Sequence, residues 1–283
     1  MNTVSLKLSS EEVNELKNFI KNGTLNEIST KNPYELLRIK NQEVSIVVYK
    51  SLKVVHNNSE ASKAIISNIL KKEEGYDYIL GSDETGKGEW YGPLIIVATA
   101  LSPPEIIALR ELGVKDSKKM KKSQLMELAN KLIKMRFKRH SVRIFPEKYN
   151  TRYKQFQKEG KSLNDMMAWA HSKAIQELLD KIEFKKAKVI IDKFDYEKTE
   201  FRLEKVDKKN LEIIQISGGE SETSVAAASI IAKYLFEIEV DKLNEEYKID
   251  LRSSQPEDID PKILPNVAKT HFKNVSKFLD DKN

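Results

Sequence analysis

The sequence predicts an α/β protein of two units, a small α+β unit over residues 1–75 and a larger α/β unit over residues 76–283. Three observations predict this organisation. The 283 residues correspond to about two domains, at roughly 150 residues each. Apolar residues alternate with polar ones in some segments and recur every three or four residues in others, which indicates mixed strands and helices. Residues 71–75 are charged, end in glycine and precede an abrupt apolar run, so we place the domain boundary there.

The small unit is predicted as a strand and a helix, followed by three strands and a second helix. Apolar and polar residues alternate over residues 4–8, as in a half-buried strand. Ser9 and Glu12 then offer a capping box before residues 13–20, whose apolar side chains recur at helical spacing. The later elements are predicted over residues 34–40, 43–49, 53–55 and 60–72.

The larger unit contains longer strands that alternate with helices. Five strands are predicted, over residues 78–80, 94–99, 136–145, 187–191 and 211–216. Amphipathic helices are predicted over residues 125–135, 163–178 and 224–243, and a further helix over residues 261–278. The alanines at 226–228 indicate that the third amphipathic helix packs closely on the sheet.

The composition excludes several classes of protein. The chain has no cysteine, which excludes a disulfide framework and any thiolate site and fits a reducing compartment. No apolar run approaches the roughly 18 residues that cross a bilayer, and the first residues lack the features of a signal peptide, so we expect a cytoplasmic protein without a membrane partner. Lys and Arg outnumber Asp and Glu by 49 to 43, which is compatible with a polyanionic partner. Because none of the four histidines stands at ligand spacing, any metal is predicted to be a hard ion held by carboxylates.

The densest chemical motif lies in residues 81–93, which read Gly-Ser-Asp-Glu-Thr-Gly-Lys-Gly-Glu-Trp-Tyr-Gly-Pro. Part of it matches the phosphate-binding loop G-x-x-x-x-G-K-[ST]. However, Gly88 stands where that loop needs a hydroxyl for magnesium, and Asp83 and Glu84 would repel phosphate. An apolar β-like run follows in place of the helix that such a loop must open. A nucleoside triphosphatase is therefore not predicted.

A second interpretation takes the two carboxylates as the centre of the motif. Asp83 and Glu84 follow an apolar strand, where sheet proteins place active sites, and a cation would stabilise the concentrated negative charge. The same residues are also good turn formers, so a surface hairpin stays open on the motif alone. Neighbouring residues of a regular strand face opposite sides, so both carboxylates can serve one site only if the strand ends or twists there.

Residues 83–89, together with residues 92–94, resemble the signature of type 2 ribonucleases H, and the lysine between two glycines resembles the ribonuclease HIII branch. Further segments match in the same order, at residues 114–119, 163–164, 190–194 and 224–232. Residues 1–75 resemble the TATA-binding-protein-like module that ribonuclease HIII proteins carry. The resemblance implies a ribonuclease H-like fold, with a mixed five-stranded sheet flanked by helices, preceded by a small substrate-binding domain.

The resemblance also implies an endoribonuclease that hydrolyses the RNA strand of RNA–DNA hybrids by two-metal-ion catalysis with Mg²⁺ or Mn²⁺, leaving 3′-hydroxyl and 5′-phosphate ends. Four carboxylates, both catalytic and metal-binding, carry over to Asp83, Glu84, Asp192 and Glu220, with Glu222 as a competitor for the last position. The residues support Asp192 independently, because it ends an apolar strand as Asp83 does, and parallel neighbouring strands would bring both to one edge. The alternative for Asp192 is a helix cap or a polar strand end.

Five further residues are expected to contact the hybrid. Gly86 and Gly88 let backbone atoms reach a ribose 2′-hydroxyl, the group that separates RNA from DNA, and Lys87 would hold a phosphate. Lys118 belongs to a lysine run that either flanks the hybrid or forms a solvated helix start, and Asn164 either contacts substrate or caps its helix. The small domain would grip the substrate through phosphate contacts. We expect a monomer, and the alternative functions are a non-catalytic nucleic-acid-binding protein or a nuclease for DNA junctions on the same fold.

Overall fold

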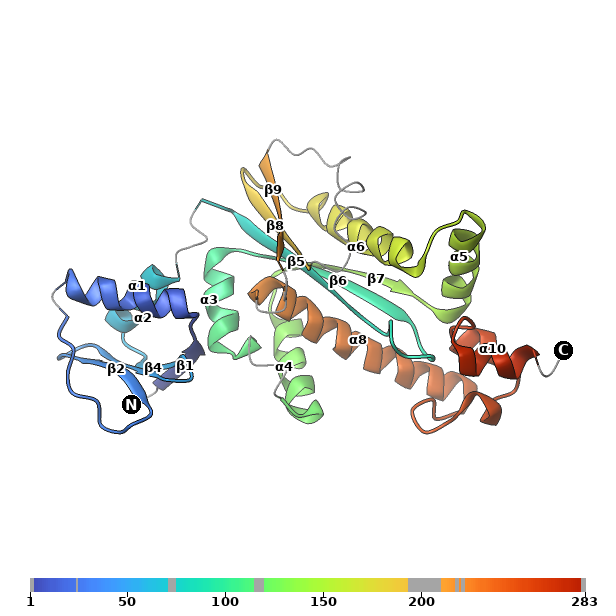
Figure 1. Cartoon of the computed structure of the whole chain (residues 1–283), viewed down its shortest axis with the longest axis horizontal. Helices are drawn as coiled ribbons and strands as arrows, with labels where there is room; N and C mark the ends of the chain where they lie inside the picture. The colour runs from blue at the N-terminus through green and yellow to red at the C-terminus, as the bar shows by residue number, and fades with distance from the viewer. Residues whose placement is uncertain are drawn as a thin grey trace.

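The computed structural model describes residues 3–23, 25–70, 75–114, 120–192, 210–216, 219 and 222–280, with the backbone alone described at Asp192, Gln215 and Ile216. Two β-sheets with their helices form the two parts of the molecule (Figure 1). Helix α3 (Pro103–Glu111) lies between the small sheet and the large one. Within the described residues, no helix is long and apolar enough to cross a membrane.

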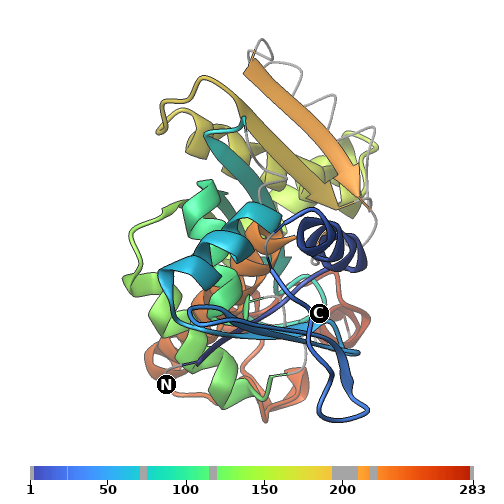
Figure 2. The same ribbon diagram turned by 90° about the vertical axis from the view of Figure 1, so that its left-hand side faces the viewer.

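The small sheet is antiparallel, with strand order β1-β4-β3-β2. Its strands are β1 (Thr3–Lys7), β2 (Glu35–Lys40), β3 (Ser45–Tyr49) and β4 (Lys53–Asn57). Helices α1 (Ser10–Lys21) and α2 (Glu60–Ile69) lie together on one side of it (Figure 2), and the apolar core fills the space between. The predicted capping box at the start of α1 is confirmed, because Ser9 and Glu12 exchange hydrogen bonds of 2.7 and 3.1 Å.

The large sheet is mixed, with strand order β7-β6-β5-β8-β9. Strands β5 (Tyr78–Thr85), β6 (Leu94–Leu101) and β7 (Lys138–Ile144) pair antiparallel, whereas β8 (Ala187–Asp192) and β9 (Leu211–Ile216) run parallel to β5. All five predicted strands are therefore confirmed, and the parallel pairing of the first with the fourth is confirmed with them. Strand β5 is longer than predicted, since it continues through the acidic pair.

Helices cover both faces of this sheet. One face is packed by α3, α4 (Lys122–Lys134) and α8 (Thr223–Tyr247), and the other by α5 (Pro146–Lys158) and α6 (Leu163–Leu179). The three predicted amphipathic helices correspond to α4, α6 and α8, while α3 and α5 were not predicted. The predicted close packing of α8 is confirmed, because a Cβ at Gly81 of β5 would lie 2.5 Å from the backbone nitrogen of Val225.

The prediction of one helix over residues 261–278 is wrong. The segment instead contains the short helix α9 (Leu264–Val267), a β-bridge residue followed by a turn, and α10 (Lys273–Asp280), and it follows the 3₁₀ turn η5 (Pro256–Asp258). The physical reason is tertiary pairing: Ala268 is extended and forms a β-bridge with Tyr91, and the N–H of Gly92 donates to the carbonyl of Val267 at 2.8 Å. A helix that continued through Ala268 could not make the bridge, and its next turn would occupy the carbonyl of Val267.

A buried ion pair joins the small sheet domain to α3. The guanidinium of Arg110, 5% exposed, donates to both carboxylate oxygens of Glu12 at 2.8 and 2.7 Å and to the carbonyl of Lys7 at 2.8 Å. Ile107 packs against the apolar core of the small domain from the same helix. Glu12 therefore both caps α1 and ties it to α3. Residues 71–74, just before the predicted boundary at residue 75, lie outside the described residues.

Candidate active site

The strands β5 and β8 bring three of the four predicted carboxylate positions to one edge of the large sheet. Gly81 of β5 pairs with Ile190 of β8. Asp83 lies two residues after Gly81, and Asp192 lies two residues after Ile190. Asp192 is the last residue of β8, and its side chain lies outside the described part. Glu220 lies outside the described residues altogether, whereas its competitor Glu222 is the N-cap of α8.

The two adjacent carboxylates bond to opposite layers of the fold. Strand β5 stays regular through them, since Asp83 pairs with Val97 and Glu84 with Ile96 of β6. The Asp83 carboxylate is hydrogen-bonded to Ser229 of α8 on one face, and Glu84 Oε2 lies 3.1 Å from His171 Nε2 of α6 on the other. The strand stays in register through this pair and ends one residue later, at Thr85. Because neither face of the sheet holds both side chains, a site that uses both carboxylates lies at the carboxyl end of β5.

Burial and mutual repulsion separate the two acids electrostatically. Burial, together with the charge of Glu84, raises the pKa of Asp83 above its ordinary value, although the hydrogen bond from Ser229 opposes this. Burial also acts to raise the pKa of Glu84, but the hydrogen bond and charge of His171, with the charge of Lys87, outweigh it and lower that pKa. Glu84 is therefore stabilised in its ionised form, whereas the ionised form of Asp83 is unfavourable and a bound cation would stabilise it.

His171 is a site residue that the sequence did not predict. It is 2% exposed on α6, and its ring joins Ser82 Oγ at 2.9 Å through Nδ1 to Glu84 at 3.1 Å through Nε2. The ring thus links the Ser82 hydroxyl at Nδ1 to the Glu84 carboxylate, to which Nε2–H donates. The sequence feature that could have identified His171 is its place in the apolar stripe of α6, four residues after Met167 and three before Ala174.

The glycines that follow the acidic pair have different structural roles. Gly86 has φ +91°, and a Cβ there would overlap the carbonyl of Pro93 and approach the Phe236 ring to 2.9 Å. Gly92 has φ +68°, and its Cβ would meet Val240 at 2.8 Å. Gly88 has no such φ, and no atom of the described residues lies within 4 Å of a Cβ built there. The chain's own packing requires glycine at the first two positions, but not at residue 88.

The other predicted substrate residues lie in different surroundings. Lys87 extends toward the acidic pair, with Nζ 3.9 Å from Glu84 Oε1. Asn164 is exposed and does not cap α6, because Ser162 is the N-cap and forms the capping box with Asp165. The capping alternative for Asn164 is therefore wrong. Lys118 lies outside the described residues.

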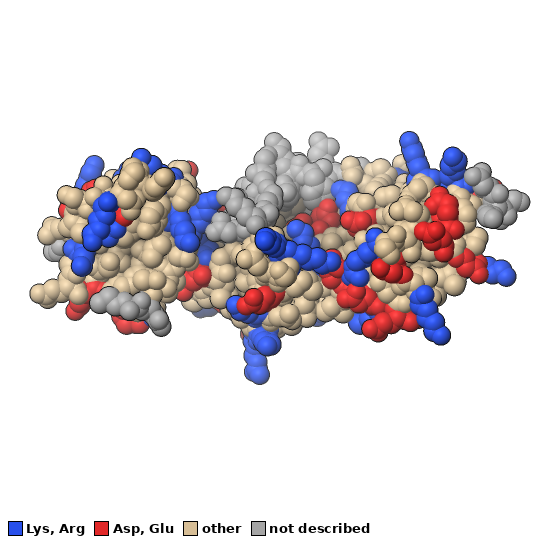
Figure 3. Space-filling model, turned by 90° about the horizontal axis from the view of Figure 1, so that it is seen from below, with Lys and Arg blue, Asp and Glu red and all other residues tan. Residues whose placement is uncertain are grey.

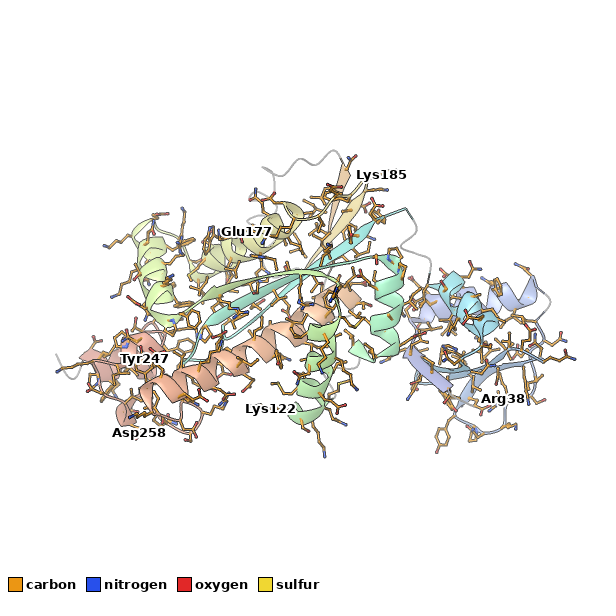
Figure 4. All side chains as sticks on the ribbon, turned by 180° about the vertical axis from the view of Figure 1, so that it is seen from behind. Arg38, Lys122, Glu177, Lys185, Tyr247 and Asp258 are labelled. Carbon is orange, nitrogen blue, oxygen red and sulfur yellow. The ribbon has the colours of Figure 1, made fainter. Side chains whose placement is uncertain are left out.

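Charge is unevenly spread over the face that Figure 3 shows. Basic side chains lie on the small domain and over the middle of the molecule, whereas acidic side chains gather toward the C-terminal end. Lys122, at the first turn of α4 (Figure 4), belongs to the predicted lysine run and forms an exposed ion pair with Glu237 at 2.8 Å. In the part of the chain that is described, no three His, Cys, Asp or Glu side chains form a metal-binding group. Two of the four predicted ligands fall outside that search.

Comparison with known proteins decides the family. The family model described as Ribonuclease HII matches residues 80–275, more than half of the chain. A ribonuclease HIII of Listeria monocytogenes is 30% identical over 279 residues, which cover 87% of this chain and 89% of that protein. The chain belongs to the ribonuclease HIII family. A ribonuclease HIII of Bacillus mycoides is 29% identical and matches 98% of this chain and 97% of its own length.

Solved structures confirm the predicted fold. Bst-RNase HIII in complex with Mn²⁺ has a TM-score of 0.61 and 23% identity, covering 99% of both chains. The ribonuclease H2 of Pyrococcus horikoshii has a TM-score of 0.60 and 24% identity, covering 72% of this chain and 98% of that one. Family membership makes the chain a metal-dependent ribonuclease H, an endoribonuclease acting on RNA–DNA hybrids. The predicted resemblance and the predicted enzyme class are thereby confirmed.

Proposed function

We propose that the chain hydrolyses the RNA strand of RNA–DNA hybrids at the edge where β5 and β8 end, with Asp83, Glu84, Asp192 and Glu220 as its catalytic and metal-binding carboxylates. One observation carries this proposal: Asp83 and Asp192 occupy matching positions at the ends of parallel neighbouring strands, beside Glu84. Carboxyl ends of strands meeting at one edge are the usual place for an active site in such a sheet.

The residues at this edge fit a divalent metal. Their donors are carboxylate oxygens, which suit Mg²⁺ or Mn²⁺, and the related Bst-RNase HIII was solved in complex with Mn²⁺. Burial and the neighbouring charge raise the pKa of Asp83, so the acidic pair is unfavourable until a cation neutralises it. When bound, two ions supply an activated water and neutralise the leaving 3′ oxygen, which gives 3′-hydroxyl and 5′-phosphate ends.

The protein's own side chains prepare the two carboxylates from opposite faces. Ser229 hydrogen-bonds to Asp83, and His171 holds Glu84 and is itself held by Ser82. Partners of this kind fix the orientation of a metal ligand and its charge before the metal arrives. For the fourth position we favour Glu220 over Glu222. In Mn²⁺ titrations, Glu220→Gln is expected to weaken binding and Glu222→Gln to leave it unchanged, and the reverse result would exchange the two assignments.

We propose that the backbone at Gly88 approaches the ribose of the RNA strand. The position is open among the described residues, so none of them explains a missing side chain there, whereas close approach of a ligand does. A 2′-hydroxyl can pair with backbone amides and carbonyls, which allows the loop to distinguish RNA from DNA. Lys87, Lys118 and Asn164 are proposed to hold neighbouring parts of the hybrid, and Asn164 is exposed as this requires.

The small domain, residues 1–75, is proposed to grip the hybrid with the side of its sheet that faces away from α1 and α2. The apolar residues of the core occupy the helix side, and the cross-strand register places the basic residues Lys7, Lys53, Arg38 and Lys40 on the other. Lys40 and Lys53 are exposed there. A basic sheet face of this kind suits the phosphates of a nucleic-acid backbone.

Charge reversal tests the grip. Lys40→Glu with Lys53→Glu should weaken hybrid binding and reduce the dependence of log K on log salt by about one unit for each lost phosphate contact. The matched control is Lys21→Glu, which changes an exposed lysine of the same domain on the helix side. Equal binding by the double variant and the control at low salt would remove the proposed role of this face.

Cleavage of labelled substrates tests the function as a whole. An RNA–DNA hybrid, duplex DNA and duplex RNA are compared with and without Mg²⁺ or Mn²⁺, and only the hybrid with metal is expected to be cut. Product ends are identified by ligation and by phosphatase sensitivity. Asp83→Asn is expected to abolish cleavage while the fold is retained, and undiminished activity in that variant would refute the proposed site.

A further inference from the structure

A fully buried lysine holds the backbone of the loop that follows the acidic pair. The side chain of Lys269 is 0% exposed, and its Nζ donates to the carbonyl oxygens of Glu89, Tyr91 and Gly92 at 2.9, 2.9 and 2.7 Å. Its backbone N–H donates to the carbonyl of Trp90 at 2.7 Å. One residue, about 180 positions away in the chain, thus binds all four consecutive carbonyls of residues 89–92.

We propose that Lys269 is a positioning residue, which fixes the loop of residues 86–92 in the shape that presents Gly88 to the ribose of the substrate. This rests on the proposed role of Gly88. Lys269 is buried, and its Nζ contacts the carbonyls of the loop and lies 5.8 Å from the centre of the Tyr149 ring, so it acts through the loop rather than on the substrate. Gly88 stands directly before the anchored run and is itself open.

The chemistry of the contact favours a specific role over ordinary packing. An ammonium group has three donors at one atom, and no other side chain offers three donors to three converging carbonyls in so small a space. Burying it is costly, and burial lowers the pKa of Lys269 to about 7. Among the described residues no carboxylate forms an ion pair with it, so the carbonyls are its direct partners. Burying such a residue lowers the stability of the fold, so we attribute its presence to the loop geometry that it sets.

The anchor is itself held rigidly. Asn150 of α5, 8% exposed, donates to the carbonyls of Ala268 and Pro265 at 2.9 and 3.1 Å and accepts from the N–H of Thr270 at 2.9 Å. These bonds hold the backbone on both sides of Lys269 to the helix. On its other side, the loop packs against α8 through Gly86 and Gly92. The loop is therefore fixed between two helices that belong to opposite layers of the sheet.

The test compares Lys269→Met with Val267→Ala in the full chain. Methionine keeps the length of the side chain and removes its three donors, whereas Val267→Ala removes buried methyl groups two residues away and keeps the anchor. At a temperature where both variants are folded, Lys269→Met is expected to lower kcat/KM on the hybrid by about tenfold or more relative to Val267→Ala. Its preference for ribose over deoxyribose at the cleavage position should fall as well.

Two measurements monitor the loop independently of catalytic activity. Trp90 and Trp169 are the two tryptophans of the chain, so in a Trp169→Phe background the emission reports the loop. Lys269→Met should shift that emission to the red and increase amide exchange over residues 86–92, and Val267→Ala should do neither. Unchanged emission and exchange in Lys269→Met, or kcat/KM within about twofold of Val267→Ala, would overturn the proposal.

The two proposals can fail separately. If the wild-type chain did not distinguish ribose at Gly88, the emission and exchange experiments would still show whether Lys269 orders the loop. If Lys269→Met does not fold, Asn150→Ala carries the same test, because it leaves the lysine in place and releases its backbone. That variant should increase loop exchange and lower kcat/KM in the same direction, and no change in either would overturn the anchor role.

Discussion

The variants Gly86→Ala and Gly88→Ala should separate the effect of each glycine on stability from its effect on activity. At Gly86, φ +91° costs an L-residue about 1–2 kcal/mol, and the added Cβ also overlaps the Pro93 carbonyl and lies 2.9 Å from the Phe236 ring. We therefore expect Gly86→Ala to destabilise the fold by about 2 kcal/mol or more, which lowers Tm by roughly 4–8 °C in a domain of this size. At Gly88, where a Cβ meets no atom of the described residues, we expect no loss and up to about 1 kcal/mol of gain from the stiffer unfolded chain.

The activities of the same two variants give the decisive comparison. Thermal unfolding is followed by circular dichroism, and cleavage of a labelled hybrid is measured at a temperature where both proteins are folded. Gly88→Ala should lose about a hundredfold in kcat/KM, because a displacement of about 1 Å at the scissile ribose is enough for that. Full activity in Gly88→Ala would refute the proposed approach of ribose to this position. A marked loss of stability in Gly88→Ala would show that the fold, and not the substrate, requires glycine there.

Three further predictions concern the charged groups. Burial raises the pKa of Asp83 in the folded protein, so ionisation of Asp83 above that pKa costs stability, and Asp83→Asn removes this cost. Without metal, Asp83→Asn should therefore have a higher Tm than the wild type near pH 7. Mn²⁺ should raise the Tm of the wild type more than the Tm of the variant, and calorimetry measures both. Arg110→Ala removes the guanidinium that pairs with the buried Glu12 and should cost about 3 kcal/mol in urea unfolding of the small domain, whereas a loss below about 1 kcal/mol would show that the pair is dispensable. His171→Ala should weaken Mn²⁺ binding by about 10–100-fold in calorimetric titrations, and undiminished affinity would show that Glu84 needs no such support.

Much of the fold could be predicted because apolar periodicity reports directly which side of an element is buried. All nine strands of the two sheets were predicted, and the alanine run of α8 correctly indicated close contact with the sheet at Gly81. Helices α3 and α5 escaped prediction because neither has a wide apolar stripe, although the proline at the first position of each is a helix-start signal. Helix α5 is mostly polar and packs on the core through Tyr149 and Phe156.

The sequence predicted the acids of the proposed site, but it did not predict the residues that contact them. The motif indicated Asp83 and Glu84, and the resemblance to ribonuclease HIII implied Asp192, which its place at the end of an apolar strand supports. His171 and Lys269 reach their partners from 87 and about 180 residues away, and no local pattern encodes those contacts. Each nevertheless leaves one trace, as a titratable residue in a stretch that otherwise packs apolar side chains. Such a residue has to find a polar partner inside the fold.

The opposite orientation of Asp83 and Glu84 explains why both helical layers take part in the site. On a regular strand, two adjacent carboxylates cannot share one face, so each layer has to supply its own polar partner, Ser229 from α8 and His171 from α6. A shift of β5 by one residue would turn both carboxylates to the wrong layer and leave both partners without an acid. The register of β5 is fixed from its other end, where Gly81 admits α8 and pairs with Ile190 of β8. The same glycine that allows close packing therefore determines which carboxylate faces which helix.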